Sequence, residues 1–443
     1  MRRGLLACAL LLGAAAPLTA CAQEQGNPPQ GVRIGLNYAA GNKPGIIILP
    51  IERTNGDSIG TIIGRDLDYS DRMNVIVLDA ATIKALTPGP NRKINYGLME
   101  KFGASVLLMG VPSAAGVQIT VYDVSAKKKI GSADFVLPKG QRDATWRFAV
   151  HGVSDEIERW VLGVRGMAQS RIAFVQNGAI KVVDSDGAMT RTIRAGRGSL
   201  SPSWSFDGTR LVYCVLGDNG TQIFEADLKT GEISRISAIR PGLNITPVFT
   251  ADGSAIVYSR GADEGSDLVM VDRSGYTQRL TVGNGTDNTS PSFSPDGSQI
   301  AFISARSGLP NVYIMDADGT NMTLLTGVDM RVPNYRASPD WSPDGRSIAY
   351  EQRASGGFQV WMSDVRSRVP KQLTTDGENE DPSWAPDARH LVITSTRGGD
   401  KQLWVLDTET GRFRQLTHSP GARLASWSPL LGRHAPLLAG PAK

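Results

Sequence analysis

Short apolar runs alternate with polar turn sequences along the second half of the chain, at a regular period. Each unit starts with a motif of the form Pro-x-(Trp or Phe)-x-x-Asp-Gly, and an apolar run follows every full copy. Full copies begin at Pro202, Pro247, Pro291, Pro339 and Pro382, the last with Ala388 in place of the glycine. Two further apolar runs and a short closing run complete each unit. Four short strands at a period of 40–50 residues are typical of a β-propeller blade.

The two ends of this repeat complement each other. Residues 171–193 supply the second, third and fourth strands of a unit that lacks its first. Residues 425–429 repeat the first strand, and no further unit follows them. Pairing the two would complete a sixth blade and remove an open sheet edge. The sequence therefore predicts a six-bladed propeller over residues 164–431, closed by the C-terminal strand, with a tail over 432–443.

Several recurring residues have structural explanations within this repeat. Four tryptophans occupy the same repeat position and are expected to pack between blades: Trp204, Trp341, Trp384 and Trp427. The Asp-Gly pairs suit hairpin turns between the first two strands. The sequences Asp184–Gly187 and Asp316–Gly319 resemble calcium loops but lack the later ligands and the distal Glu, so we predict turns there. Cys214 lies in an apolar run and is expected to be a small buried residue.

The region before the repeat has a different pattern, in which apolar runs alternate with amphipathic stretches. Its patterns predict five strands, at 45–50, 74–78, 106–109, 117–122 and 129–136. They also predict three helices, at 57–69, 94–102 and 145–162. The sequence therefore predicts an α/β N-terminal domain over residues 32–163, joined to the propeller by a short connector.

The first residues have the pattern of an export signal. Two arginines precede an apolar run from Leu5 to Ala16 that is too short to span a bilayer, and small residues follow. Two processing events fit: ordinary cleavage after Ala22, or lipidation of Cys21 at a sequence resembling a lipobox. Residues 1–22 are thus predicted to be a signal peptide, and the polar, Pro- and Gly-rich residues 23–31 a flexible tether.

Composition excludes several classes of protein. The 443 residues include 41% hydrophobic and 20% charged, which suits a folded chain of two or three domains. Three cysteines are too few for a disulfide scaffold. The net charge of +4 falls to +2 without Arg2 and Arg3, and Lys127–Lys129 is the main basic cluster, so nucleic-acid binding has little support.

Candidate chemistry is sparse. The sequence Gly56-Asp-Ser58-Ile-Gly60 matches the pattern of a hydrolase elbow, but the polar residues before it do not form a core strand, and Ser58 fits better as a helix start. The four histidines show no metal-ligand spacing. We therefore expect no catalytic residues, no metal and no cofactor.

An exported chain with a small α/β domain and a six-bladed propeller resembles the TolB family of the Tol–Pal cell-envelope system. The likeness extends from about Val32 to Leu431. Local matches include Pro44–Pro50, Ser154–Ile157, Arg171–Phe174 and the closing Ser426–Leu430. The resemblance implies a non-enzymatic, monomeric periplasmic adaptor that supports outer-membrane integrity and invagination during cell division.

The resemblance also implies two partners. The propeller would bind the peptidoglycan-associated lipoprotein Pal on the face whose loops enter each first strand. The corresponding positions are Leu200, Asn244, Thr246, Thr289, Ser290, Arg336, Glu380, Asp381 and Arg423. The inner-membrane protein TolA would bind the N-terminal segment, about residues 32–42, through Val32, Arg33, Ile34, Leu36 and Tyr38. Membrane association would come through these partners or through a lipid on Cys21.

The sequence departs from the family pattern at two points, and two alternative functions remain open. Ser290 stands where the family often has an acidic residue, and a lipid on Cys21 would restrict the TolA-binding segment. The same architecture would also serve an envelope propeller that holds a sugar or another ligand in its channel. A propeller attached to a prolyl-peptidase-like enzyme is the other alternative, although no hydrolase-sized domain is left over. If the TolA-binding segment and the Pal face are coupled, occupation of one changes the order of the other.

Overall fold

The computed structural model describes residues 43–51, 58–88, 93–138, 143–194, 197–218, 220–236, 242–262, 265–283, 285–327, 335–354 and 356–432. All of them belong to one compact unit, residues 35–443. The predicted signal peptide, the tether, Cys21 and the TolA-binding segment lie outside the described residues.

A five-stranded sheet organises the N-terminal domain, in the order β2-β1-β3-β4-β5. Its strands are β1 (Gly45–Ile48), β2 (Asn74–Val75), β3 (Val106–Ser113), β4 (Gly116–Asp123) and β5 (Lys128–Val136). Its helices are α1 (Ile59–Tyr69), α2 (Ala80–Leu86), α3 (Tyr96–Lys101) and α4 (Ala144–Leu162). Strand β1 is parallel to β2 and β3, whereas β3, β4 and β5 are antiparallel.

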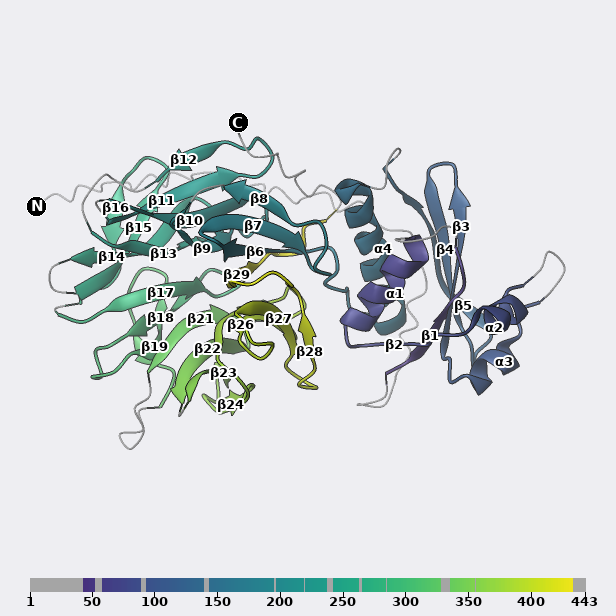
Figure 1. Ribbon diagram of the computed structural model, residues 1–443. Helices are drawn as coiled ribbons and strands as arrows, with labels where there is room; N and C mark the ends of the chain where they lie inside the picture. The colour runs from purple at the N-terminus through teal and green to yellow at the C-terminus, as the bar shows by residue number, and fades with distance from the viewer. Residues whose placement is uncertain are drawn as a thin grey trace, which may run out of the picture. The chain divides into compact units, whose positions relative to one another are not determined.

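The helices form a layer on each side of this sheet (Figure 1). Helices α1 and α4 pack against one face, and α2 and α3 cover part of the other. The predicted α/β domain is confirmed, with two local differences. The expected strand 74–78 is only the two-residue β2, and α2 was not predicted, because its seven residues are too short for a clear helical period.

Capping residues explain where the two long helices begin. The Ser58 hydroxyl accepts a hydrogen bond from the Thr61 N–H at 3.1 Å and caps α1, so its interpretation as a helix start is confirmed. The Asp143 carboxylate does the same for α4 by accepting from the N–H groups of Thr145 and Trp146. Helix α4 ends at Gly163, whose φ of 77° is the left-handed conformation common after helices.

Six four-stranded sheets form the propeller, and each is one blade (Figure 1). Blade 1 contains β29 (Ala422–Trp427), β6 (Arg171–Gln176), β7 (Ala179–Asp184) and β8 (Arg191–Arg194). Blade 2 contains β9 (Ser199–Trp204), β10 (Arg210–Gly217), β11 (Gly220–Asp227) and β12 (Ile233–Arg235). Blade 3 contains β13 (Asn244–Phe249), β14 (Ala255–Ala262), β15 (Gly265–Asp272) and β16 (Thr277–Arg279).

The remaining blades repeat this plan. Blade 4 contains β17 (Asn288–Phe293), β18 (Gln299–Ser304), β19 (Asn311–Asp316) and β20 (Thr323–Leu324). Blade 5 contains β21 (Arg336–Trp341), β22 (Ser347–Ala354), β23 (Gly357–Asp364) and β24 (Pro370–Gln372). Blade 6 contains β25 (Asn379–Trp384), β26 (His390–Ser395), β27 (Gln402–Asp407) and β28 (Phe413–Gln415).

The C-terminal strand closes the ring as predicted. Strand β29 is antiparallel to β6, with Ala422 opposite Gln176 and Trp427 opposite Ile172. Just beyond this pairing, the Ser428 N–H donates to the Arg171 carbonyl at 2.8 Å, and the Arg171 N–H donates to the Ser428 hydroxyl at 2.9 Å. Blade 1 is therefore assembled from both ends of the repeat.

Apolar residues from neighbouring blades form shared cores. One core combines Val392 and Leu403 of blade 6 with Phe174 and Trp427 of blade 1. Trp204, Trp341 and Trp384 lie in comparable cores between blades, so the predicted packing role of the repeat tryptophans is confirmed. Cys214 is fully buried, also as predicted.

We expect Trp427→Ala to lower the free energy of unfolding by about 3–5 kcal/mol, because it empties a large buried site in the closing blade. The substitution also removes the indole N–H that donates to the Ser170 hydroxyl at 2.8 Å. Urea denaturation followed by circular dichroism measures this loss. Val369→Ala, at a side chain that is 63% exposed, should change stability by less than about 0.5 kcal/mol. Equal effects of the two substitutions would contradict the closing role of Trp427.

Candidate functional site

The innermost strands of the six blades surround a central channel with a cavity of about 490 Å³. These strands are β9, β13, β17, β21, β25 and β29. We call the face where the chain enters them the strand-entry face, and the opposite face, with the turns that follow them, the turn face. The strand-entry face carries all the positions that the sequence assigned to a Pal-binding surface.

Each innermost strand contains the same irregularity at its third residue. The pairing with the second strand shifts there, as at a β-bulge, in all six blades. The third residue is left-handed in every blade, with φ between 46° and 54°, and none is glycine. These residues line the channel and form what we call the bulge ring: Ser201, Thr246, Ser290, Ser338, Asp381 and Leu424. Six such residues at one site are unusual, because L-residues rarely adopt this conformation.

The predicted contact residues at the first position of their strands are buried between blades. Asn244 is 5% exposed, and its amide donates to the Thr221 carbonyl at 2.8 Å. Arg336 is 6% exposed and hydrogen-bonds to Gln352 at 3.0 Å and to Asn311. These two side chains hold neighbouring strands together and are not available as a contact surface. The motif alignment could not show that these side chains are buried. It gives the position of a residue in its strand but not whether the side chain packs between blades or faces solvent.

The second position is more accessible. Leu200, Thr289 and Glu380 are partly exposed, and Arg423 is exposed. Glu380 forms an ion pair with Lys401 at 2.5 Å, in blade 6. These four residues remain candidates for partner contact.

The third-position candidates, Thr246, Ser290 and Asp381, belong to the bulge ring. Their N–H groups take part in hydrogen bonds between blades. The Ser290 N–H lies 3.2 Å from both the Thr246 and the Ser259 hydroxyl oxygens, and the Asp381 N–H donates to the Glu351 carboxylate at 2.8 Å. The second strand of one blade thus supports the bulge of the next.

Glu351 and Asp381 form an acidic pair at this channel. Burial raises the pKa of Glu351 to about 8, and the neighbouring Asp381 charge adds to the effect. Burial also raises the pKa of Asp381, reinforced by the charge of Glu380. At neutral pH the pair therefore holds a proton, so its negative charge is smaller than two carboxylates would suggest.

The turn face contacts the N-terminal domain through charged residues near the C-terminal end of α1. Arg72 pairs with Asp387 at 3.3 Å, in the turn after β25. Arg412, in the turn before β28, pairs with Asp71 at 2.8 Å and with Asp68 at 3.1 Å. The described hydrogen bonds and ion pairs between domain and propeller lie at this face, and the strand-entry face takes no part in them.

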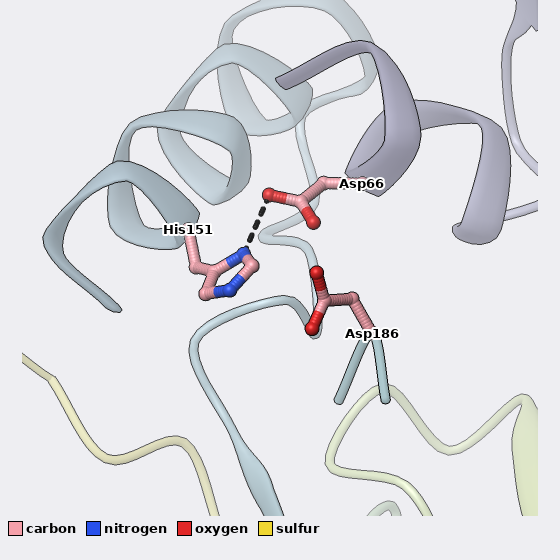
Figure 2. A group of neighbouring side chains, drawn as sticks. All are labelled: Asp66, His151 and Asp186. Atoms are coloured by element: carbon pink, nitrogen blue, oxygen red, sulfur yellow. Dashed lines mark hydrogen bonds and ion pairs between the residues drawn. The ribbon is translucent and has the colours of Figure 1, made fainter. Parts of the chain in front are cut away.

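A buried cluster of Asp66, His151 and Asp186 lies at the same interface (Figure 2). His151 comes from α4, Asp66 from α1 and Asp186 from the turn after β7 of blade 1. The His151 Nδ1 is 2.8 Å from an Asp66 oxygen. Burial opposes a charge on His151, but the charge and hydrogen bond of Asp66, together with the charges of Asp186 and Asp184, raise its pKa to about 9. His151 is therefore a cation at neutral pH.

This donor set could in principle hold a metal ion, since imidazole and carboxylates are common ligands. The surrounding charges oppose it. Arg65 pairs with Asp186 at 3.1 Å, and Arg147 pairs with the same oxygen. His151 is already bonded to Asp66. The cluster is best explained as an ionic link between the domain and blade 1.

A second group, Asp71, His390 and Asp407, has the same character. The His390 Nδ1 lies 2.8 Å from an Asp387 oxygen, and its Nε2 lies 3.4 Å from an Asp71 oxygen. Arg389 pairs with Asp407 at 2.6 Å. The sequence did not reveal the links from His151 to Asp66 and from His390 to Asp71, because these partners lie far apart along the chain.

Nothing in the described residues forms a catalytic set. Ser58 is a helix cap and has no histidine beside it, and the buried histidines are bonded to carboxylates in ionic links. The fold defines the class: a six-bladed β-propeller with an α/β domain on its turn face.

Comparison with known proteins identifies the family of this chain. Residues 159–431 match the family model described as the TolB beta propeller domain, and the chain belongs to this family. A protein named "Protein TolB homolog" from Chlorobium luteolum is 33% identical over 52% of this chain and 53% of its own length. The "Tol-Pal system protein TolB" from Xylella fastidiosa is 28% identical over 54% of this chain and 56% of its own length. The chain thus spans about half the length of these curated relatives.

A solved structure extends the likeness of fold to the N-terminal domain. The crystal structure of TolB from Acinetobacter baumannii superposes with a TM-score of 0.75 at 24% identity, and covers 88% of this chain and 97% of that one. The predicted architecture, an α/β domain followed by a six-bladed propeller, is therefore confirmed.

We expect the His151 link to make stability pH-dependent above neutrality. The folded-state pKa of about 9 exceeds the ordinary 6.5, so the stabilisation is complete below pH 6.5 and is lost as the pH rises through 9. Between pH 7 and pH 9 the wild type should lose more free energy of unfolding than His151→Asn, as measured by urea denaturation at each pH. The control is His418→Asn, at an exposed histidine. Parallel pH profiles for wild type and His151→Asn would refute the ionic link.

Proposed function

We propose that the protein is the periplasmic adaptor of a Tol–Pal system, which binds the lipoprotein Pal on its strand-entry face. Family membership supports the system, and one observation supports the face. The N-terminal domain makes its described polar contacts with the turn face, and none of these contacts involves the strand-entry face.

The chemistry of the strand-entry face also suits a protein partner. The apolar side chains of Leu243, Leu309 and Tyr335 are exposed on loops of this face, which also carries the charged Glu380 and Arg423. Protein-binding sites combine exposed apolar and polar side chains in this way. Of the nine residues proposed from the sequence, we retain Leu200, Thr289, Glu380 and Arg423 as direct contacts. We assign Thr246, Ser290 and Asp381 to the channel mouth.

The other partner and the location rest on the N-terminal residues. We propose that Val32, Arg33, Ile34, Leu36 and Tyr38 form the TolA-binding segment and that an export signal sends the chain to the periplasm. In the described residues, no helix is long and apolar enough to cross a membrane. Lipidation of Cys21 and cleavage after Ala22 both remain open. In this role the protein supports outer-membrane integrity and invagination during division.

The test is binding of the purified periplasmic domain of the organism's own Pal-like lipoprotein, measured by calorimetry. Thr289→Arg combined with Glu380→Arg should weaken binding at least about tenfold, because two long cations would crowd the interface and reverse a charge. The matched control places arginines on the turn face, at Tyr276 and Val369, which are 66% and 63% exposed. The control should bind like wild type. Undiminished binding by the strand-entry variant would rule out this face.

A ligand in the channel is the second candidate function, favoured by its volume. A cavity of about 490 Å³ lies in the range of small-molecule sites. A sugar bound there should raise the unfolding temperature in a thermal-shift screen of envelope saccharides. Ser292→Trp, which would fill the channel, should abolish that shift. If no saccharide shifts the transition, the ligand-binding alternative is discarded.

A further inference from the structure

The surface lysines of the N-terminal domain gather on one side. Except for Lys43, its described lysines belong to α2, α3, the residues just before α3, the turn between β4 and β5, or the start of β5. All are exposed: Lys84, Lys93, Lys101, Lys127, Lys128 and Lys129. Helices α2 and α3 cover the sheet face opposite to α1 and α4, which contact the propeller (Figure 1).

Strand register brings the last four of these lysines to one end of the sheet. Lys128 pairs with Asp123, which pairs with Val106 at the start of β3. Lys101 ends α3 only five positions before Val106. The neighbouring Lys129 is opposite Tyr122, a residue packed in the core beneath α3. We call Lys101, Phe102 and Lys127–Lys129 the lysine end.

The charges of the domain are unevenly distributed, although exposed carboxylates also lie at Asp79 and Asp134. Carboxylates near the propeller interface, Asp66, Asp68, Asp71, Asp155 and Glu158, lie on α1, just after it, and on α4. At the lysine end, Asp123 points its carboxylate into its own turn, where it accepts from the Ser125 hydroxyl and the Ala126 N–H at 2.8 Å. Within the described residues, lysine ion pairs involve Lys43 and Lys401 and none of the lysine end. The exposed Glu100 is adjacent to Lys101 in the sequence, but the four lysines outnumber it. The lysine end therefore has a net positive charge.

The lysine end also includes an exposed aromatic side chain. Phe102 directly follows Lys101 and is 39% exposed. Flexible lysines around an aromatic ring are typical of surfaces that lie on anionic membranes, where the ring enters the headgroup layer and the ammonium groups remain with the phosphates. Each lysine near such a surface adds to the attraction.

We propose that the lysine end binds anionic phospholipid headgroups and holds the N-terminal domain against a membrane of the cell envelope. The contact is peripheral and reversible. It is independent of Pal and TolA, since it uses neither the strand-entry face nor the N-terminal segment. An acidic protein is the competing occupant, and the lipid is favoured because Phe102 offers an apolar group to insert.

The experiment is co-sedimentation of the mature chain from Gln23 onward, which does not contain Cys21 and so carries no acyl chain there. The vesicles contain phosphatidylcholine alone or phosphatidylcholine with phosphatidylglycerol. The protein should sediment only with the anionic vesicles, and high salt should release it. Lys101→Glu, Lys128→Glu and Lys129→Glu together should lower the partition coefficient at least about tenfold. Phe102→Ser should lower it without changing the charge.

The matched control makes the same change of charge on exposed propeller residues, with Lys229→Glu, Arg235→Glu and Arg366→Glu. It should bind vesicles like wild type, and circular dichroism should show that all variants are folded. Equal loss by the control would mean that net charge, not this surface, drives binding. Absence of binding to anionic vesicles, as expected if the patch serves an acidic protein, would also overturn the proposal.

Discussion

The propeller depends on one pairing between distant parts of the chain. Arg171 and Ser428 are 257 positions apart, yet their hydrogen bond lies at the end of the β29–β6 ladder that completes blade 1. Without this ladder the ring would have two open sheet edges, which are sites of non-specific strand pairing. The channel, the bulge ring and the two distinct faces exist only because the ring is closed.

The junction between domain and propeller follows a different principle. The apolar cores of the two parts are separate, and charged residues carry much of the contact between them. Buried ion pairs contribute little net stability, because desolvation of each charge offsets most of the attraction, but loss of one partner is costly. Such a junction selects one orientation of the domain. Here Asp66 pairs with His151, whereas Asp68 and Asp71, at and just after the end of α1, share Arg412.

The repeat made the propeller predictable, because spacing alone gave the blades, the closing strand and the tryptophan positions. The N-terminal strands and long helices were also predictable from their periodicity. Features that depend on contacts between distant residues were not. No local sequence signal shows that His151 and Asp186 cluster with Asp66, and Asp186 was interpreted only as a turn residue. Likewise, Asn244 and Thr289 occupy neighbouring positions of equivalent strands, and only the structure separates the buried side chain from the accessible one.

The bulge ring has a consequence for how such a protein can diverge. Serine, threonine, aspartate and leucine all adopt the same left-handed conformation there, so the geometry of the closed ring, not the identity of the residue, sets the backbone. Substitutions at these six positions can therefore alter the polarity and charge of the channel mouth while the strands keep their path. Single substitutions in the bulge ring can therefore change which ligands or partners fit the channel mouth. The closed ring maintains the strained backbone conformation in each variant.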